Sequence, residues 1–151
     1  MAGQDRTATT IWEGDLRTGK GEVSFDSSGA AGPLPVSFPS RFERAGGQTS
    51  PEELLAAAHA ACYSMALSNI LGSGGNPPDR LETSATASLE PAEGGFAITK
   101  VRLVVRGTVA GLGEEQFLEA ARKAEQGCPV SKAIAGNVEL TLDAALAQPG
   151  A

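Results

Sequence analysis

The stretch Ser50–Leu71, SPEELLAAAHAACYSMALSNIL, decides the fold because it predicts one long apolar helix. Ser50, Pro51 and Glu53 match the S-x-x-E pattern that starts a helix, with proline at the first helical position. The Ser50 hydroxyl can accept a first-turn amide, and the Glu53 carboxylate can reach back to the Ser50 amide. The rest of the segment is apolar on nearly every face, and such helices are buried. We therefore expect a central buried helix with Cys62 in its middle.

Alternating apolar and polar residues predict strands on both sides of this helix. Before the helix, strands are expected at Thr7–Gly14, at Gly19–Asp26 and, within a loop rich in Gly and Pro, around Leu34–Phe38. After it, strands are expected at Leu81–Leu89, Phe96–Thr108 and Asn137–Ala145, with helices at Gly113–Gln126 and Val130–Ala135.

This order of elements predicts a single α+β domain over residues 1–151, in which helices pack on a mainly antiparallel sheet. Residues 1–6 and 147–151 are expected to be tails. A helix that is apolar all round must be covered on more than one side, which points to a dimer.

Charge and hydropathy argue against a nucleic-acid-binding, membrane-spanning or secreted protein. The net charge is −6 with an isoelectric point of about 4.8, and no stripe of Lys and Arg is present, so we expect no nucleic-acid partner. No apolar run approaches the roughly 20 residues that span a bilayer. The N-terminal residues lack the apolar region of a secretion signal. These features predict a cytoplasmic protein with no membrane contact.

Cys62 and Cys128 are the two cysteines of the chain. A structural disulfide is not expected in the cytoplasm, and two sulfurs with one histidine cannot fill a four-ligand zinc site without carboxylates. Cys62, among alanines and leucines, would be an inert thiol unless a cation favoured its thiolate. Cys128 precedes Pro129 at a break in the backbone, where it could approach another sulfur. Two inert thiols or a redox pair both remain open.

The other polar residues of this region have two interpretations each. His59 lies one turn from Cys62 and could act as its base in a cysteine hydrolase, or it could face an interface or make a core hydrogen bond. Taken alone, Arg41 would be an exposed loop charge and Glu52 a capping residue.

A set of short motifs in matching order resembles the OsmC/Ohr family of hydroperoxide reductases, and in particular its OsmC branch, the osmotically inducible proteins. The motifs span Trp12 to about Asp143 and are Trp12–Asp15, Gly19–Gly21, Arg41–Glu43, Pro51–Leu55, Ala57–Cys62, Met65–Leu67, Gly95–Lys100 and Gly127–Ser131. Ser50 departs from the asparagine usual in the family, but both residues are good N-caps.

The resemblance implies an OsmC-like fold and a site made of Cys62, Cys128, Arg41 and Glu52. Cys62 would attack the peroxide, Cys128 would resolve the resulting sulfenic acid to a disulfide, Arg41 would polarise the peroxide bond and Glu52 would orient Arg41. The implied reaction converts organic hydroperoxides, and more slowly hydrogen peroxide, to alcohols or water in oxidative and osmotic stress defence. No cofactor is implied. The reductant would be an external dithiol of the lipoyl type or a lipoylated protein.

The spacing of two site residues adds a constraint. Glu52 precedes Cys62 by ten residues on the expected helix, which is about 15 Å along the axis. A glutamate side chain cannot cover that distance, so Glu52 can serve Cys62 only from a second chain. We therefore expect an intertwined homodimer with two composite sites, as the resemblance also implies.

Two alternatives to the peroxidase make different predictions. A hydrolase using Cys62 and His59 would not need Cys128. A non-catalytic protein that binds an apolar ligand or serves as a stress-storage protein would have thiols that react slowly with peroxide and show no lowered pKa.

Overall fold

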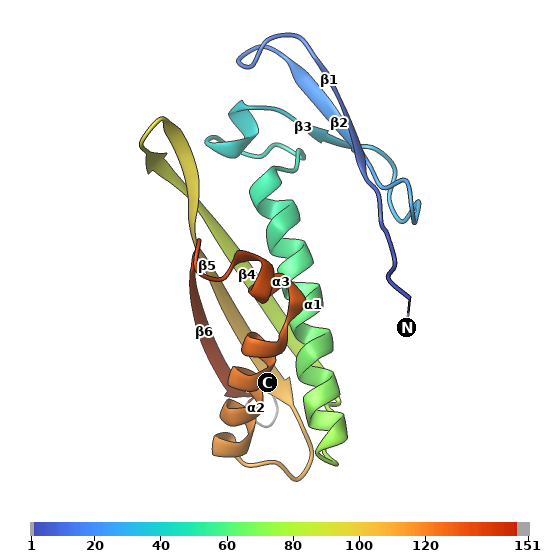
Figure 1. Ribbon diagram of the computed structural model, residues 1–151, viewed down its shortest axis with the longest axis vertical. Coiled ribbons are helices and arrows are strands. Elements are labelled where there is room, and N and C mark those ends of the chain that lie inside the picture. The colour runs from blue at the N-terminus through green and yellow to red at the C-terminus, as the bar shows by residue number, and fades with distance from the viewer. Residues whose placement is uncertain (1, 148–151) are drawn as a thin grey trace. The chain divides into compact units, whose positions relative to one another are not determined.

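The computed structural model describes residues 2–147 and divides the chain into two compact units, residues 1–54 and 55–151 (Figure 1). Residue 1 of the expected N-terminal tail and residues 148–151 of the expected C-terminal tail lie outside the described residues.

Unit 1 contains a three-stranded antiparallel sheet in the order β1-β2-β3, which confirms the three strands expected there. The strands are β1 (Thr9–Glu13), β2 (Lys20–Ser24) and β3 (Leu34–Val36). Trp12 on β1 lies opposite Gly21 on β2. A Cβ atom on Gly21 would stand 2.9 Å from the Trp12 ring, so glycine lets the indole lie against the strand. A short 3₁₀ helix, η1 (Pro39–Arg41), occupies part of the segment expected to be loop.

The long helix is α1 (Pro51–Ser73), and its start agrees only in part with the expected cap. The Ser50 Oγ accepts the Glu53 amide at 3.1 Å, which confirms Ser50 as the N-cap. The Glu53 carboxylate does not reach back to Ser50; it accepts the hydroxyl of Thr49 at 2.8 Å, so that half of the expected box is wrong. A hydroxyl four residues away satisfies this carboxylate instead.

Unit 2 contains a mixed three-stranded sheet in the order β4-β5-β6. Its strands are β4 (Arg80–Ala92), β5 (Gly95–Thr108) and β6 (Glu139–Leu146). The first two form an antiparallel hairpin that pairs as far as Ala92 and Gly95, beyond the expected strand ends at Leu89 and Phe96. β6 runs parallel to β5, because the chain crosses between them through α2 (Glu114–Gly127) and α3 (Pro129–Ile134).

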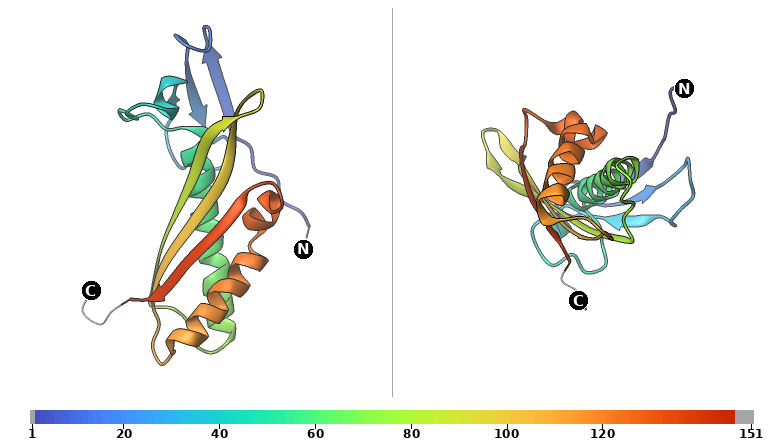
Figure 2. Two further views of the ribbon diagram at one scale, coloured as in Figure 1. Left: turned by 90° about the vertical axis from the view of Figure 1, so that its left-hand side faces the viewer. Right: turned by 90° about the horizontal axis from the view of Figure 1, so that it is seen from below.

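The core of unit 2 lies between the sheet and helices α1 and α2, which cover the same face of it (Figure 2). Val101, Leu103 and Val105 on β5 point into this core and are fully buried, whereas the residues between them face away. The helices are tied to each other by Tyr63, whose buried hydroxyl donates to the Ala121 carbonyl at 3.0 Å.

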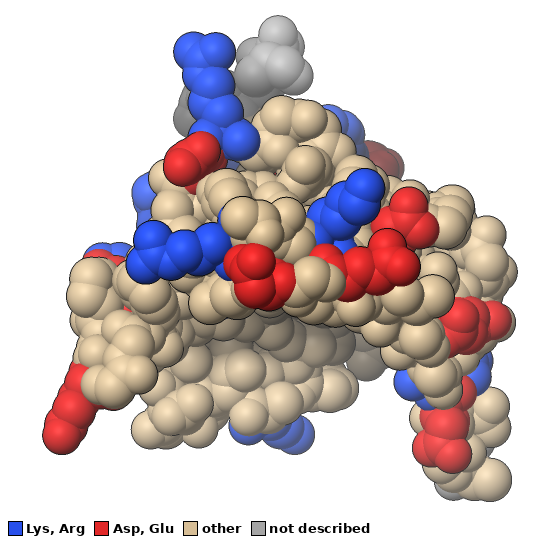
Figure 3. All heavy atoms as spheres, turned by 90° about the horizontal axis from the view of Figure 1, so that it is seen from above, with Lys and Arg blue, Asp and Glu red and all other residues tan. Residues whose placement is uncertain are grey.

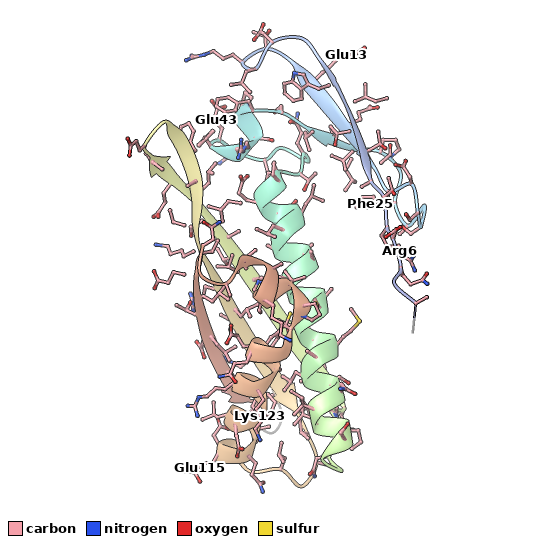
Figure 4. The ribbon with its side chains drawn as sticks, viewed as in Figure 1. Arg6, Glu13, Phe25, Glu43, Glu115 and Lys123 are labelled. Carbon is pink, nitrogen blue, oxygen red and sulfur yellow. The ribbon has the colours of Figure 1, made fainter. Side chains whose placement is uncertain are left out.

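Helix α2 has the amphipathic pattern expected from the sequence. Phe117, Ala121 and Ala124 are buried on its inner side. Glu115 and Lys123 project from the helix on its exposed side (Figure 4). The outer side therefore meets solvent while the inner side completes the core.

Helix α1 is not covered on every side within one chain, contrary to the expectation of full burial. In unit 2 its buried residues are His59, Tyr63, Leu67 and Leu71, which recur every four positions and so form one stripe. Met65, on another side, is 68% exposed. The sheet and α2 cover one stripe only, and the remaining apolar surface of the helix is open.

The length and composition of α1 also correct a second expectation. Its 23 residues are long and apolar enough to cross a membrane, so the statement that no run reaches this length is wrong. Core helices of water-soluble proteins pass the same test, and one stripe of α1 packs in the core of unit 2.

Charged side chains of both signs are interspersed on the face shown in Figure 3. That face has mixed charge and no basic stripe of the kind that phosphate binding needs.

Candidate active site

The two cysteines lie together in unit 2. Cys62 is half-buried on α1, and Cys128 is fully buried at the junction of α2 and α3. Both are free thiols, and they are close enough for each to shift the pKa of the other. Cys128 has extended backbone angles (φ −64°, ψ 121°) before Pro129, and this break in the helical path turns its side chain out of the helix ladder.

Cys128 is the N-cap residue of α3, and its side chain makes no capping hydrogen bond. Burial raises the pKa of Cys128, but the polar groups of Ser131 and the neighbouring Cys62 thiol outweigh burial and bring the pKa below its ordinary value. The amide of Val130 acts in the same direction. The local backbone thus favours a thiolate at Cys128.

Cys62 has the opposite environment. Burial raises its pKa, the Val130 amide lowers it, and the adjacent Cys128 raises it again, so that the pKa ends above its ordinary value. None of the groups that shift it in the described chain is a lysine or arginine. A thiol of this kind stays protonated until a cation is brought near it.

His59 is fully buried and does not serve Cys62 in this structure. Its Nε2 lies 2.7 Å from the Ser131 Oγ, and its Nδ1 has no hydrogen-bond partner among the described residues. Burial lowers the pKa of the imidazole, which favours the neutral ring. The contact agrees with a core hydrogen bond and gives no support to a Cys62–His59 hydrolase.

Ser131 was not singled out by sequence reasoning. It lies at the third position of a six-residue helix, directly after a Cys-Pro pair, and is 2% exposed. No local pattern could have indicated its bond to His59, which lies 72 residues earlier in the chain.

Arg41 and Glu52 lie together in unit 1. The Arg41 Nη2 is 2.6 Å from Glu52 Oε1, and Nε is 3.3 Å from Oε2, which makes a two-point ion pair. Glu52 is 8% exposed. The Ser40 hydroxyl donates to the Thr49 carbonyl at 3.1 Å and so ties η1 to the residues before α1. Arg41 is therefore paired and only partly exposed, contrary to its interpretation as an exposed loop charge. Glu52 lies in the first turn of α1, as expected of a capping residue, and also holds Arg41.

An apolar cavity of about 360 Å³ adjoins Arg41 in unit 1. Its walls include Trp12, Leu16, Phe38 and Leu54. A guanidinium in such a wall can bind the polar end of a ligand whose apolar part fills the cavity.

The four residues predicted for the site thus form two pairs, each within one unit. In residues 2–147 no group of three or more His, Cys, Asp or Glu side chains could hold a metal ion. The chemistry available to these pairs is that of thiols and a permanent cation.

Comparison with known proteins gives one consistent group of relatives. Residues 44–143 match the family model described as OsmC-like protein. The chain is 47% identical to Peroxiredoxin OsmC of Escherichia coli, over 87% of this chain and 90% of that protein. It is 32% identical to an organic hydroperoxide resistance protein of Xanthomonas axonopodis pv. citri, over 83% of this chain and 87% of that protein. Among solved structures, the organic hydroperoxide resistance protein OhrB of Bacillus subtilis matches with a TM-score of 0.71 and 33% identity, over 91% of this chain and 97% of that one.

Proposed function

The chain belongs to the family of OsmC-like proteins, and on this premise we propose that it is a cytoplasmic thiol peroxidase that reduces organic hydroperoxides to alcohols. The names of its relatives, a peroxiredoxin and organic hydroperoxide resistance proteins, support the reaction class. The observation that carries the proposal is the pair of neighbouring free thiols in unit 2, one half-exposed and one buried. The cytoplasm suits it, because thiols stay reduced there.

Cys62 is the attacking thiolate in this proposal. Its sulfur forms a bond to one peroxide oxygen while the O–O bond breaks, and the alcohol leaves after taking up a proton. Cys62 is thereby oxidised by two electrons to a sulfenic acid. The partial exposure of Cys62 allows a peroxide to reach it.

Cys128 is the resolving thiol. Its sulfur attacks the Cys62 sulfenic acid, the S–S bond forms, and the hydroxyl leaves as water. An external dithiol then reduces the disulfide by exchange, and the family implies a dithiol of the lipoyl type or a lipoylated protein. The closeness of the two thiols, each of which shifts the pKa of the other, supports this step.

Arg41 supplies the positive charge that Cys62 lacks. A guanidinium is charged at every relevant pH and can both favour a thiolate and polarise a peroxide bond. The two-point ion pair with buried Glu52 fixes the plane of the guanidinium. The apolar cavity beside Arg41 favours organic peroxides over hydrogen peroxide.

The composite site requires a homodimer, with Arg41 and Glu52 of one chain serving Cys62 of the other. Ten residues of helix separate Glu52 from Cys62, about 15 Å, which no glutamate side chain spans. Helix α1 leaves apolar surface open to solvent, including Met65, which is 68% exposed. A second copy of the chain packed on this surface would bury the helix on its remaining sides. The two units would then work as one domain, in agreement with a family match that runs across both.

A turnover assay tests the proposal. Purified protein is given cumene hydroperoxide or hydrogen peroxide with excess dihydrolipoamide, beside the variants Cys62→Ser and Cys128→Ser. We expect turnover that prefers the organic peroxide, no reaction with Cys62→Ser, and one oxidation without efficient recycling with Cys128→Ser. Equal inactivity of wild type and Cys62→Ser would instead favour a non-catalytic protein with buried thiols.

A further inference from the structure

A buried hydrogen bond joins α1 to α3. The Nε2 of His59, which is fully buried, lies 2.7 Å from the Oγ of Ser131, which is 2% exposed. The two residues are 72 positions apart, so the bond belongs to the tertiary fold and not to either helix. A hydrogen bond shielded from water is stronger than one at the surface. This bond can therefore fix how α3 lies against α1.

Helix α3 depends on such contacts for its position. It has six residues, and isolated helices of this length are not stable in water. Among its residues, all of which the structure describes, Ser131 alone is buried. The side chain that anchors α3 in unit 2 is thus the one that is bonded to His59.

The cysteines lie one helical turn from the two ends of this bond. Cys62 follows His59 by three positions on α1, and Cys128 precedes Ser131 by three positions at the start of α3. Residues three apart on a helix are neighbours, with about 5–6 Å between their Cβ atoms. The Cys128 carbonyl accepts the Lys132 amide at 3.0 Å, so the backbone of Cys128 moves with α3. The bond between His59 and Ser131 therefore limits how far Cys128 can move from Cys62.

The polar character of the pair also points to positioning. The His59 Nδ1 has no partner among the described residues, and a proton there would be a buried donor without an acceptor. The proton therefore belongs on Nε2, which donates to the Ser131 Oγ. Burying a histidine with one unpaired nitrogen costs free energy that an apolar pair would not. In return, a hydrogen bond restricts distance and angle more narrowly than an apolar contact does.

We propose that His59 and Ser131 are positioning residues for the resolving step: their hydrogen bond holds α3 on α1 and so keeps Cys128 within reach of the Cys62 sulfenic acid. This inference rests on the proposed peroxidase function. In the step, the S–S bond forms, the S–O bond of the sulfenic acid breaks, and the hydroxyl leaves as water with the proton of the Cys128 thiol. His59 and Ser131 are unchanged at its end.

A redox titration tests the positioning without any peroxide. Wild type, His59→Leu and Ser131→Ala are equilibrated with mixtures of reduced and oxidised glutathione, and the Cys62–Cys128 disulfide is quantified by mass spectrometry after thiol alkylation. We expect each variant to lower the equilibrium constant for disulfide formation by about fivefold, the worth of one ordinary hydrogen bond. The double variant should lower it no further, because both changes remove the same bond. If one single variant does not fold, the other still tests the bond.

Ser64→Ala is the matched control. Ser64 follows Cys62 by two positions on α1, and its hydroxyl bonds with the Ala60 carbonyl and the Thr83 hydroxyl, each at 2.8 Å. It therefore ties α1 to β4 and not to α3. This variant should lose a comparable contact and keep the wild-type redox equilibrium.

Single-turnover kinetics connect the contact to the reaction. With one equivalent of cumene hydroperoxide, His59→Leu and Ser131→Ala should form the Cys62 sulfenic acid at nearly the wild-type rate. Disulfide closure should be about 10- to 100-fold slower, because the resolving sulfur is misplaced. With excess peroxide, the longer-lived sulfenic acid should be oxidised further to a sulfinic acid, which mass spectrometry detects at Cys62.

A wild-type redox equilibrium in both single variants would overturn the inference. An equal loss in Ser64→Ala, or a double variant that adds the two single effects, would overturn it as well. Because the glutathione titration needs no peroxidase activity, failure of the proposed function would show separately, as the absence of any oxidation of wild type by cumene hydroperoxide.

Discussion

Unit 1 and unit 2 differ sharply in how much apolar surface they bury. Among the described residues, Val23 is the only buried hydrophobic side chain of unit 1. Unit 2 buries a continuous core that includes Tyr63, Leu67, Leu103, Val105 and Phe117. Unit 1 instead exposes large apolar side chains, among them Ile11 at 66% and Leu16 at 59%. A sheet with so little buried apolar area is marginal alone, so unit 1 needs a partner surface.

The chemistry is divided in the same way. Unit 1 holds a fixed guanidinium and carboxylate but no cysteine, and unit 2 holds both thiols, of which Cys62 has a raised pKa and no cation to lower it. Neither unit has the parts of a peroxidase by itself. A second copy of the chain would therefore cover the exposed apolar surface and also complete the proposed site.

Mixed subunits give the largest expected effect and the sharpest test of this division. Arg41→Ala and Cys62→Ser should each be nearly inactive as pure dimers. A mixed dimer would combine Arg41 of the second variant with Cys62 of the first in one of its two sites. Random mixing should therefore restore about a quarter of wild-type activity, since half the dimers are mixed and each has one working site. Turnover of cumene hydroperoxide after co-refolding of the two variants measures it.

Absence of any recovery in verified mixed dimers would mean that Arg41 and Cys62 act from the same chain. A fully active monomer in sedimentation would contradict the composite site more directly. Mixing two preparations of the same variant is the matched control, and it should recover nothing.

Loss of the Arg41–Glu52 ion pair in unit 1 is expected to have a smaller effect on activity, and the neighbouring Glu53 provides a matched control variant. Glu52→Gln removes the carboxylate that fixes Arg41, and a misplaced guanidinium is expected to lower kcat/KM by about 10- to 100-fold. Glu53→Gln, one residue away, affects only the bond from the Thr49 hydroxyl, which an amide oxygen can still accept. Its activity should stay close to wild type. Equal losses in both variants would indicate damage to the helix start and would remove the orienting role of Glu52.

Local physics explains which elements could be predicted from the sequence. Ser50, Pro51 and the apolar run after them determine a helix start by short-range rules, and the structure begins α1 at Pro51. Alternation predicted each strand, but it has the same period in parallel and antiparallel pairs, so the parallel pairing of β5 with β6 could not be predicted. Likewise, the Glu53 carboxylate had two donors within reach, and only the folded chain shows that Thr49 is the one bonded.

The site was predictable to a different degree. From the residues alone Arg41 and Glu52 were a loop charge and a cap, because an ion pair across eleven positions depends on how η1 and α1 fold together. Only the family resemblance joined them to the cysteines. Ser131 belongs to the Gly127–Ser131 motif of the resemblance but was given no role, because neither its burial nor its bond to distant His59 leaves a local mark in the sequence.

The smallest expected effect concerns the packing that lets unit 2 hold its own core. A Cβ atom on Gly107 would stand 2.5 and 2.6 Å from two ring atoms of fully buried Phe117, which has no free space to retreat. Gly107→Ala should therefore lower the free energy of unfolding by about 1–3 kcal/mol through overpacking. Gly72→Ala, in α1 with open space around its Cβ, should instead gain up to about 1 kcal/mol from helix propensity. Urea denaturation of both variants measures the difference. If Gly107→Ala matched wild type, Phe117 would not press on β5 as described, and tight packing of unit 2 at this contact would be contradicted.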